Sequence, residues 1–213
     1  MKKTIFTIYL TAIFLFISVS GFCQNTQTNT KSTIDYKFSV FTTYLSFTNF
    51  GKPETNTHHY EIQARYQLTD KDGVGVKAAI WKLFAPMGIP IWDDQFLEED
   101  AFYPGRIREA GVGVTYQRKL WKGLFTTLEI LPLKTTYFDE SDIQIDSGFK
   151  LYNSYHLGYH IPLFKKGRFF IEPQIHINHW VVNTNVPQAF KAEEAKWDNY
   201  FLIEPNLYIG IKF

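Results

Sequence analysis

The chain has 213 residues, and its 22 Lys and Arg residues nearly balance its 21 Asp and Glu residues, so its formal net charge is +1. This balance excludes a dedicated nucleic-acid surface, and the single cysteine excludes a disulfide framework and a cysteine-based metal cluster. Aromatic residues make up 18% of the chain, which is too many for disorder and indicates extensive buried or lipid-facing surface. The only long apolar run is at the N-terminus, so a polytopic helical membrane protein is excluded as well. A soluble β protein and a membrane β-barrel remain.

The first 23 residues have the pattern of a signal peptide. A positive start at Met1-Lys2-Lys3 is followed by an apolar stretch over 5–19 and by small residues at the two positions before a cleavage site, in Gly21-Phe22-Cys23. A membrane anchor is an alternative, although about 15 apolar residues are few for a spanning helix. A lipoprotein with lipid on Cys23 is another, although Phe22 is bulky for that recognition. Residues 24–34, rich in Thr, Asn and Gln, are expected to form a flexible polar lead-in to a single domain over 35–213.

Apolar residues recur at every second position throughout that domain, and no segment after residue 24 has a convincing helical period. We therefore expect a nearly all-β chain. The predicted strands are 35–48, 58–69, 73–84, 107–119, 123–137, 149–162, 167–182 and 199–213.

The connections between these strands alternate in length. Those at 70–72, 120–122 and 163–166 are tight, whereas those at 49–57, 85–106, 138–148 and 183–198 are longer. In a transmembrane barrel the periplasmic turns are short, the outer loops are long, and an even strand number leaves both termini on the periplasmic side. The sequence thus predicts an eight-stranded antiparallel up-and-down transmembrane β-barrel in the outer membrane.

Alternation alone also fits a soluble sandwich, but three features favour the barrel. The strands of 12 to 16 residues expected here exceed the usual five or six of soluble proteins. Aromatic residues collect near strand ends, as in interfacial girdles: Tyr36, Tyr44, Tyr60, Trp81, Trp121, Tyr137, Tyr159, Trp180 and Tyr200. The last strand is expected to present one wholly apolar face from Phe201 to Phe213, and its Tyr208, Ile209, Ile211 and Phe213 resemble the signal read by the barrel-assembly machinery.

A barrel of eight strands is just wide enough for side chains to fill, so an aqueous pore is disfavoured. The inward positions collect charged residues and histidines: Glu61, Arg65, Lys77, Glu109, Glu129, His156, His160, Glu172, His176, Glu204 and Lys212. Such groups can form a catalytic or proton-relay site, but a paired structural network is favoured. Glu172 and Glu204, at matching places in adjacent strands, are expected to pair with Arg65 or Lys77.

The three lumen histidines could in principle bind a metal ion, because imidazole is a common ligand. No His-x-His spacing lies on one strand, so ordinary hydrogen bonding is favoured, and we expect no metal and no cofactor.

His179 has the opposite parity to His176 and should point outward. Some outer-membrane lipid A deacylases resemble small barrels with His, Ser and a carboxylate on the outer wall, with the Ser two residues after the His. Here Val181 stands at that place, and Thr184 is the only nearby hydroxyl. His179 as general base and Thr184 as its hydroxyl partner are therefore the candidates of a less favoured enzyme hypothesis.

Two predicted outer loops carry acidic clusters, at 93–100 and 139–146. A bridging cation to lipopolysaccharide is one interpretation and solvated charge is the favoured one. The loop over 85–106 is also apolar, aromatic and proline-rich, so we expect it to fold against the barrel rim or close the lumen, or to contact a partner.

Several motifs are similar to those of a family of small, uncharacterised outer-membrane barrels of Bacteroidetes-type bacteria. They are Gly88-Ile89-Pro90, Phe102-Tyr103-Pro104-Gly105, Tyr116-Gln117-Arg118 with Trp121-Lys122-Gly123, 180–187, and 196–205. The resemblance implies location and fold, and it carries over no catalytic residue.

The sequence thus favours a non-enzymatic outer-membrane barrel that contributes to envelope integrity or binds through its outer loops. Its expected partners are outer-membrane lipid, lipopolysaccharide and the assembly machinery. The alternative is a barrel enzyme acting on lipid or lipopolysaccharide.

Overall fold

The computed structural model describes residues 36–49, 56–96 and 98–213. The predicted signal peptide over 1–23 and the polar lead-in over 24–34 lie outside the described residues. The strands are β1 Phe38–Thr43, β2 Tyr60–Gln67, β3 Asp72–Leu83, β4 Arg106–Trp121, β5 Leu124–Phe138, β6 Gln144–Tyr159, β7 Ile161–Leu163, β8 Phe169–Asn183 and β9 Tyr200–Lys212. The helical elements are the 3-10 turns η2 Tyr44–Phe47 and η3 Glu99–Ala101 and the helix α2 Gln188–Glu194.

The strands form one closed antiparallel barrel. Each of β1 to β5 pairs with the next strand in the chain, β6 pairs with β8, β8 with β9, and β9 returns to β1. The three-residue β7 only extends the turn before β8. Eight strands therefore close the ring, which leaves no free sheet edge along it and confirms the predicted fold class.

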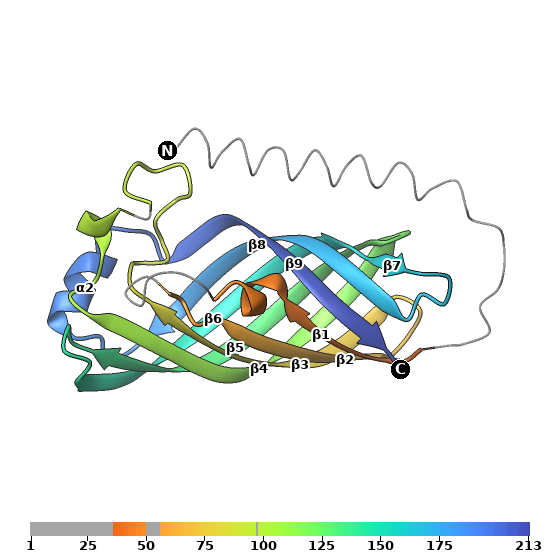
Figure 1. Cartoon of the computed structure of the whole chain (residues 1–213), viewed down its shortest axis with the longest axis horizontal. Helices are drawn as coiled ribbons and strands as arrows, with labels where there is room; N and C mark the ends of the chain where they lie inside the picture. Colours follow the sequence, from red (N-terminus) through yellow and green to blue (C-terminus); the bar gives the residue numbers. More distant parts are fainter. Residues whose placement is uncertain (1–35, 50–55, 97) are drawn as a thin grey trace. The chain divides into compact units, whose positions relative to one another are not determined.

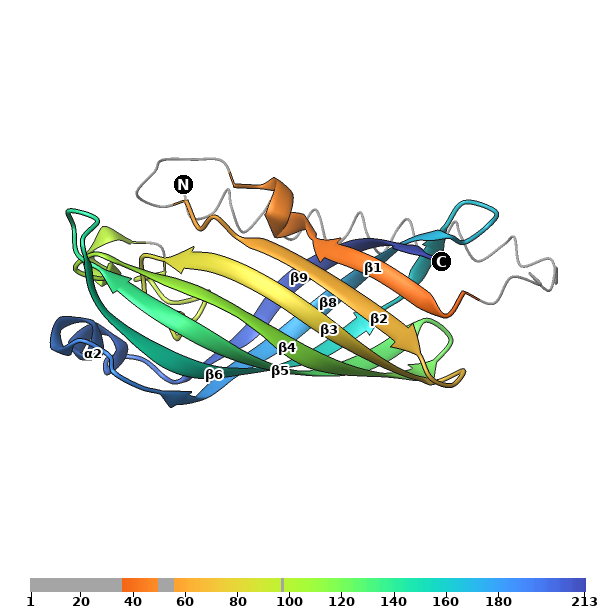
Figure 2. The ribbon, with the colours of Figure 1, turned by 90° about the horizontal axis from the view of Figure 1, so that it is seen from below.

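The two ends of the barrel differ, as Figure 1 shows. One end, called the turn end here, carries the short connections β2–β3 and β4–β5, the β7 turn, the C-terminus and the start of β1. The other, the loop end, carries α2 and the connection from β3 to β4. Figure 2 shows β1 to β6 side by side and tilted, as barrel closure requires.

The outer wall is apolar. Alternate residues of every long strand point outward, and on β4 they include Val112, 65% exposed, Val114 and Tyr116. Comparable exposed apolar residues line β2, β3, β5, β6, β8 and β9. An apolar belt around a closed barrel is the surface that a bilayer requires. The described part of the chain has no helix long and apolar enough to cross a membrane.

The first strand is much shorter than the predicted 35–48, because the chain turns into η2 after Thr43. The Thr43 hydroxyl accepts a hydrogen bond from Leu45 N, which caps this turn. The edge of β2 is satisfied by side chains instead: Ser46 Oγ accepts from Glu61 N, and Asn49 bonds both N and O of His59. Local hydroxyl and amide groups thus replace a strand partner here.

Two of the connections predicted to be longer also differ from the prediction. The connection at 138–148 is shorter than expected, because β6 begins at Gln144 and only a tight turn around Asp139 separates it from β5. The connection at 183–198 contains the helix α2, whereas no helix was expected. Seven residues are too few to show a helical period in the sequence, and packing of Phe190 stabilises the helix.

The last strand contains a bulge that breaks its predicted apolar face. His176 lies opposite Glu204 but Asn178 lies opposite Phe201, so β9 has one extra residue, and Ile203 adopts a φ of 60° there. Phe201 consequently packs with the inner cluster around Trp81 rather than outward. The expectation that Phe201 to Phe213 share one face was wrong beyond the bulge.

Three of the nine expected girdle aromatics also face inward. Trp81, Tyr137 and Trp180 are buried in the barrel, because they have the same parity as the polar lumen residues on their strands. Tyr60, Trp121 and others among the nine remain exposed on the wall.

Candidate functional site

The lumen near the turn end holds a chain of polar side chains centred on Glu172 of β8. Arg65 of β2 forms a bidentate ion pair with it, at 3.1 Å for Nη1–Oε1 and 2.9 Å for Nη2–Oε2. His160 Nδ1 lies 2.8 Å from Glu172 Oε1, and Lys212 Nζ lies 2.7 Å from His160 Nε2. Arg65 also donates to Gln117 at 2.5 Å. These contacts link β2 across the lumen to β8, to β9 through Lys212, and to the turn that follows β6 through His160.

The middle of the lumen is organised by Lys77 of β3. Its Nζ lies 2.8 Å from Glu61 Oε2 and 2.9 Å from Glu129 Oε1, so one ammonium group forms ion pairs with two buried carboxylates. Beside this triad the rings of His156 and His176 stack with centroids 3.8 Å apart, as expected from their direct cross-strand pairing. This arrangement is a dense, desolvated charge network rather than an open cleft.

A third group of polar contacts lies toward the loop end. Lys150 Nζ is 2.5 Å from Glu109 Oε1, and Trp81 Nε1 donates to Glu109 Oε2 at 2.8 Å. Glu109 and Lys150 are almost fully buried. Around them the lumen becomes apolar, with Ala79, Trp81, Leu131, Leu133, Tyr152 and Trp180 in one cluster.

The loop end is closed by an apolar cap, defined by Tyr103, Ile107, Tyr137 and Phe190, all buried. Phe190 comes from α2, and its ring centroid lies 5.2 Å from that of Tyr103 and 5.3 Å from that of Tyr137. The prediction that the β3–β4 connection folds against the rim agrees with this packing. Backbone bonding supports it too, since Tyr103 N donates to Phe84 O.

One carboxyl lies at the edge of the cap. Glu194 of α2 accepts from Tyr103 Oη at 3.3 Å and from Asn183 Nδ2 at 2.8 Å. Burial, which disfavours the charged form, is the largest effect and raises the pKa of Glu194. Burial also raises the pKa of Tyr103 well above its usual value, with the neighbouring Glu194 adding to the effect.

The structure places the eleven charged residues and histidines named from the sequence at inward positions. Ten of them take part in the contacts described above. The eleventh, Glu204, lies at the bulge and accepts a hydrogen bond from Asn178 Nδ2. The structure also shows one that sequence reasoning missed, Lys150, whose parity matches His156 on the same strand. The expectation that Glu172 and Glu204 occupy matching positions was wrong: Glu172 lies opposite Tyr208 in register. Arg65 does pair with Glu172, as expected, whereas Glu204 has neither Arg65 nor Lys77 as an ion-pair partner.

His179 and Thr184, the candidates of the enzyme hypothesis, do not meet. His179 points outward, and the hydrogen-bond partner found for it among the described residues is Asn199 Nδ2, at 3.5 Å. The Thr184 hydroxyl, just beyond the end of β8, instead bonds the backbone N and O of Phe149 on β6. A general base needs a hydroxyl within hydrogen-bond reach, and this geometry does not supply one.

Neither the histidines nor the acidic loops form a metal site: within the described ranges no group of three or more His, Cys, Asp or Glu side chains could hold a metal ion. Asp139 instead accepts hydrogen bonds from Ser141 N and Ile143 N, and Asp142 pairs with Arg106.

The residues predicted as an assembly signal lie on the final strand, beside β1. Ile209 and Phe213 are exposed on the wall, and Tyr208 is buried in the lumen against Phe41 and Phe170. Gly210 lies between these rings, and a Cβ there would come within 2.4 Å of Phe170 Cζ.

Neither a protein-family model nor a curated protein matches the chain, so the resemblance to a Bacteroidetes-type family stays a prediction. Solved structures similar to it include Ail of Yersinia pestis in complex with the heparin analogue sucrose octasulfate, at 13% identity and a TM-score of 0.39, covering 83% of this chain and 94% of Ail. Neisserial surface protein A is similar at 10% identity and a TM-score of 0.44, with 83% and 94% covered. The outer membrane protein Ail in a phospholipid nanodisc is similar at 12% identity and a TM-score of 0.41, with 84% and 100% covered. Similarity this distant bears on neither ligand nor activity.

Proposed function

We propose that this protein is a non-enzymatic outer-membrane β-barrel whose lumen is closed by its own side chains, and that it contributes to envelope integrity or binds at the cell surface through its outer loops. The observation that carries the proposal is the division of the barrel into an apolar outer wall and an ion-paired interior. That division suits a bilayer outside and no solute path inside.

The interior argues against a pore on energetic grounds. The buried cations Arg65, Lys77 and Lys150 each contact a buried carboxylate, so widening the lumen for a solute would break desolvated ion pairs. Breaking one such pair by removing a partner typically costs about 3–5 kcal/mol. The apolar cap adds a second barrier at the loop end.

We also propose an orientation for the barrel, which is supported by the difference between its two ends. We assign the turn end to the periplasm and the loop end to the cell exterior, because short turns face the periplasm in barrels of this type. An N-terminal signal peptide over 1–23 is consistent with export, and the apolar Ile209, Ile211 and Phe213 with recognition by the assembly machinery.

Three measurements test this function. The folded protein should fractionate with the outer membrane and migrate differently on gels before and after boiling. After insertion into planar bilayers it should give no stepwise ion conductance. Recovery as a soluble periplasmic monomer would exclude the membrane assignment, and stable conductance would exclude the closed lumen.

The enzyme alternative has its own test. Envelope lipid composition should be the same in cells carrying the wild-type protein and in cells carrying His179→Ala, because the hydrogen-bond partner of this imidazole in the described part of the chain is the amide of Asn199 and not a hydroxyl. A difference in acylation between those cells would reinstate the lipid-modifying hypothesis.

A further inference from the structure

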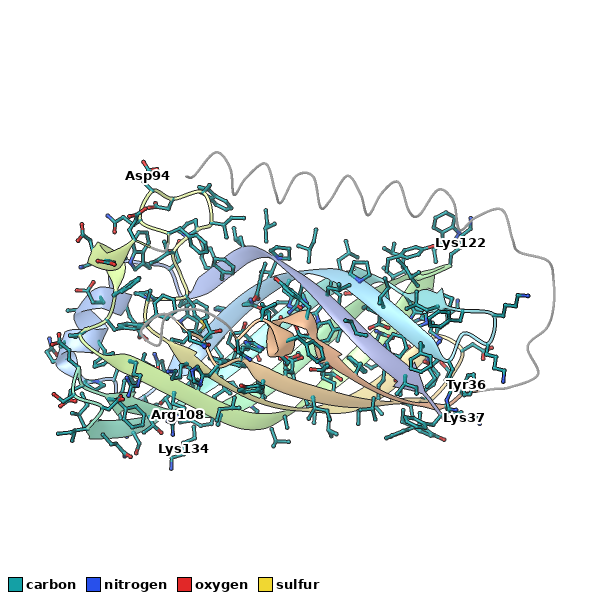
Figure 3. All side chains as sticks on the ribbon, viewed as in Figure 1. Tyr36, Lys37, Asp94, Arg108, Lys122 and Lys134 are labelled. Carbon is teal, nitrogen blue, oxygen red and sulfur yellow. The ribbon has the colours of Figure 1, made fainter. Side chains whose placement is uncertain are left out.

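One part of the outer wall departs from the apolar pattern. On three neighbouring strands the outward positions change from apolar to cationic toward the loop end: Ile80 is followed by Lys82 on β3, Ala110 by Arg108 on β4, and Pro132 by Lys134 on β5. Arg106 is the next outward residue of β4. We call Lys82, Arg106, Arg108 and Lys134 the wall patch, and Figure 3 shows Arg108 and Lys134 projecting from the outside of the barrel.

The cations of the wall patch lie close together. Lys82 is directly opposite Arg108 in the β3–β4 register, and Lys134 is one outward step diagonal from Arg108 on β5. Like charges directly opposite each other on a sheet are destabilising, so this arrangement is unfavourable without a counter-charge. The positive potential reaches neighbouring loop groups: the pKa of His58 is lowered first by desolvation and then by the charges of the wall patch.

Counter-charge from the protein is scarce here. Arg106 pairs with Asp142, but in the described part of the chain no carboxylate lies within ion-pair distance of Lys82, Arg108 or Lys134. The side chains of Arg108 and Lys134 are exposed. The aromatic ring of Phe138 lies beside the patch, 5.1 Å from Arg108 Cζ, which is a typical companion of cations at a membrane interface.

The location indicates which anion fits. The patch borders the apolar belt, so its counter-charge lies at the depth of lipid headgroups. It is also confined to β3, β4 and β5, because the β6 residue opposite Lys134 is the apolar Phe149. The turn that follows β5, beyond Lys134, carries the acidic residues Asp139 and Glu140, which would repel a polyanion approaching from solution.

We propose that the wall patch binds the phosphate groups of a phosphorylated outer-leaflet glycolipid, such as the lipid A part of lipopolysaccharide, whose acyl chains lie against the apolar outward residues of β3 to β5. The guanidinium and ammonium groups project from three neighbouring strands, and neighbouring strands lie about 4.8 Å apart. Several cationic groups spread in this way suit the oxygens of phosphate groups better than a single carboxylate. This inference rests on the proposed membrane location and adds a defined lipid site to it.

The test uses the full-length protein folded in uncharged-detergent micelles. Its binding is compared for lipopolysaccharide and for the same lipopolysaccharide after enzymatic removal of its phosphates. The wild-type protein should bind the phosphorylated form more tightly, and R108Q/K134Q should weaken that binding about 30-fold, because each Lys or Arg near an anionic leaflet contributes a factor of about five. Lys82→Gln alone should weaken it about fivefold.

The matched control is K165Q/K166Q, which removes the same charge from exposed lysines in the turn before β8 and should leave binding unchanged. Equal affinity for the dephosphorylated lipid, or equal losses in the two double variants, would overturn the proposal. Tighter binding of a soluble sulfated polysaccharide or of inorganic pyrophosphate would overturn the lipid as occupant.

The failure of this site can be told apart from failure of the proposed function. Heat-dependent gel migration and outer-membrane fractionation of each variant report membrane folding independently of lipid binding. A barrel that inserts normally without phosphate-dependent binding refutes the wall patch alone, whereas a barrel that does not insert refutes both.

Discussion

Replacing Lys77 with methionine removes the cation that two buried carboxylates share while keeping a side chain of similar length. Glu61 and Glu129 would then face each other in the lumen without the ammonium group that now lies within 3 Å of each. At least one carboxyl must then become neutral. For an ordinary glutamate, with a pKa of about 4.3, this costs about 3.7 kcal/mol at pH 7 and only about 1 kcal/mol at pH 5.

We therefore expect Lys77→Met to lower the free energy of unfolding by about 4 kcal/mol at pH 7, within the range found when a buried pair loses one partner. The loss should shrink at pH 5. The assay is urea unfolding of the protein refolded into lipid vesicles, followed by tryptophan fluorescence at both pH values. The triple variant K77M/E61Q/E129Q should recover most of the stability, because it leaves no unpaired charge.

The matched control is Lys166→Met, at an exposed turn position, which should change stability by less than about 0.5 kcal/mol. Full stability of Lys77→Met at pH 7 would show that the lumen is wet enough to solvate both carboxylates. A loss of the same size at both pH values, shared by the triple variant, would point to packing instead of charge.

Three further predictions concern the cap and the interior. Phe190→Ala should weaken the docking of α2 by about 3 kcal/mol, since it removes a buried ring. Faster proteolysis within 183–198 with an unchanged barrel would show this, and unchanged resistance of that segment to the protease would contradict it. Because its pKa is raised in the folded cap, Glu194 binds a proton more tightly there, so docking should be strongest at low pH and weaken as pH rises through its folded pKa. Glu194→Gln should remove this pH dependence of hydrogen exchange in α2, and a profile identical to wild type would contradict the assignment. Gly210→Val should destabilise the barrel by about 1–3 kcal/mol through overpacking against Phe170, measured by urea unfolding; a neutral effect would mean that the ring moves freely.

Much of the fold was predictable because strands have a period of two. Alternation separated an apolar from a polar face on each strand, strand length and the aromatic residues near strand ends favoured the apolar face as the outer wall, and the alternating short and long connections distinguished the two ends. The inward charged residues followed from the same parity. Lys150 obeys this rule as well, since it lies within the predicted strand 149–162 and has the parity of His156, so the same rule could have identified it.

Local exceptions to that period were not visible in the sequence. The bulge at Ile203 turns Phe201 inward, and η2 shortens β1 because hydroxyl and amide side chains satisfy the neighbouring edge. The bulge and the 3-10 turn depend on how strands pack, and short sequence windows do not record that. Trp81 and Trp180, in contrast, obey the period: they resemble interfacial anchors by their position along the strands, but their parity places them inside.

The residue order along the chain was enough to predict the class of the fold, the apolar wall and most of the charged lumen residues, since strand parity and connection lengths are read directly from it. Which charges meet depends on the folded barrel. Lys77 is shared by Glu61 and Glu129, and Arg65 meets Glu172, because strand register and barrel closure bring together positions that are far apart in the chain. For the same reason the wall patch exists only in the folded barrel, where three strands bring its four cations together.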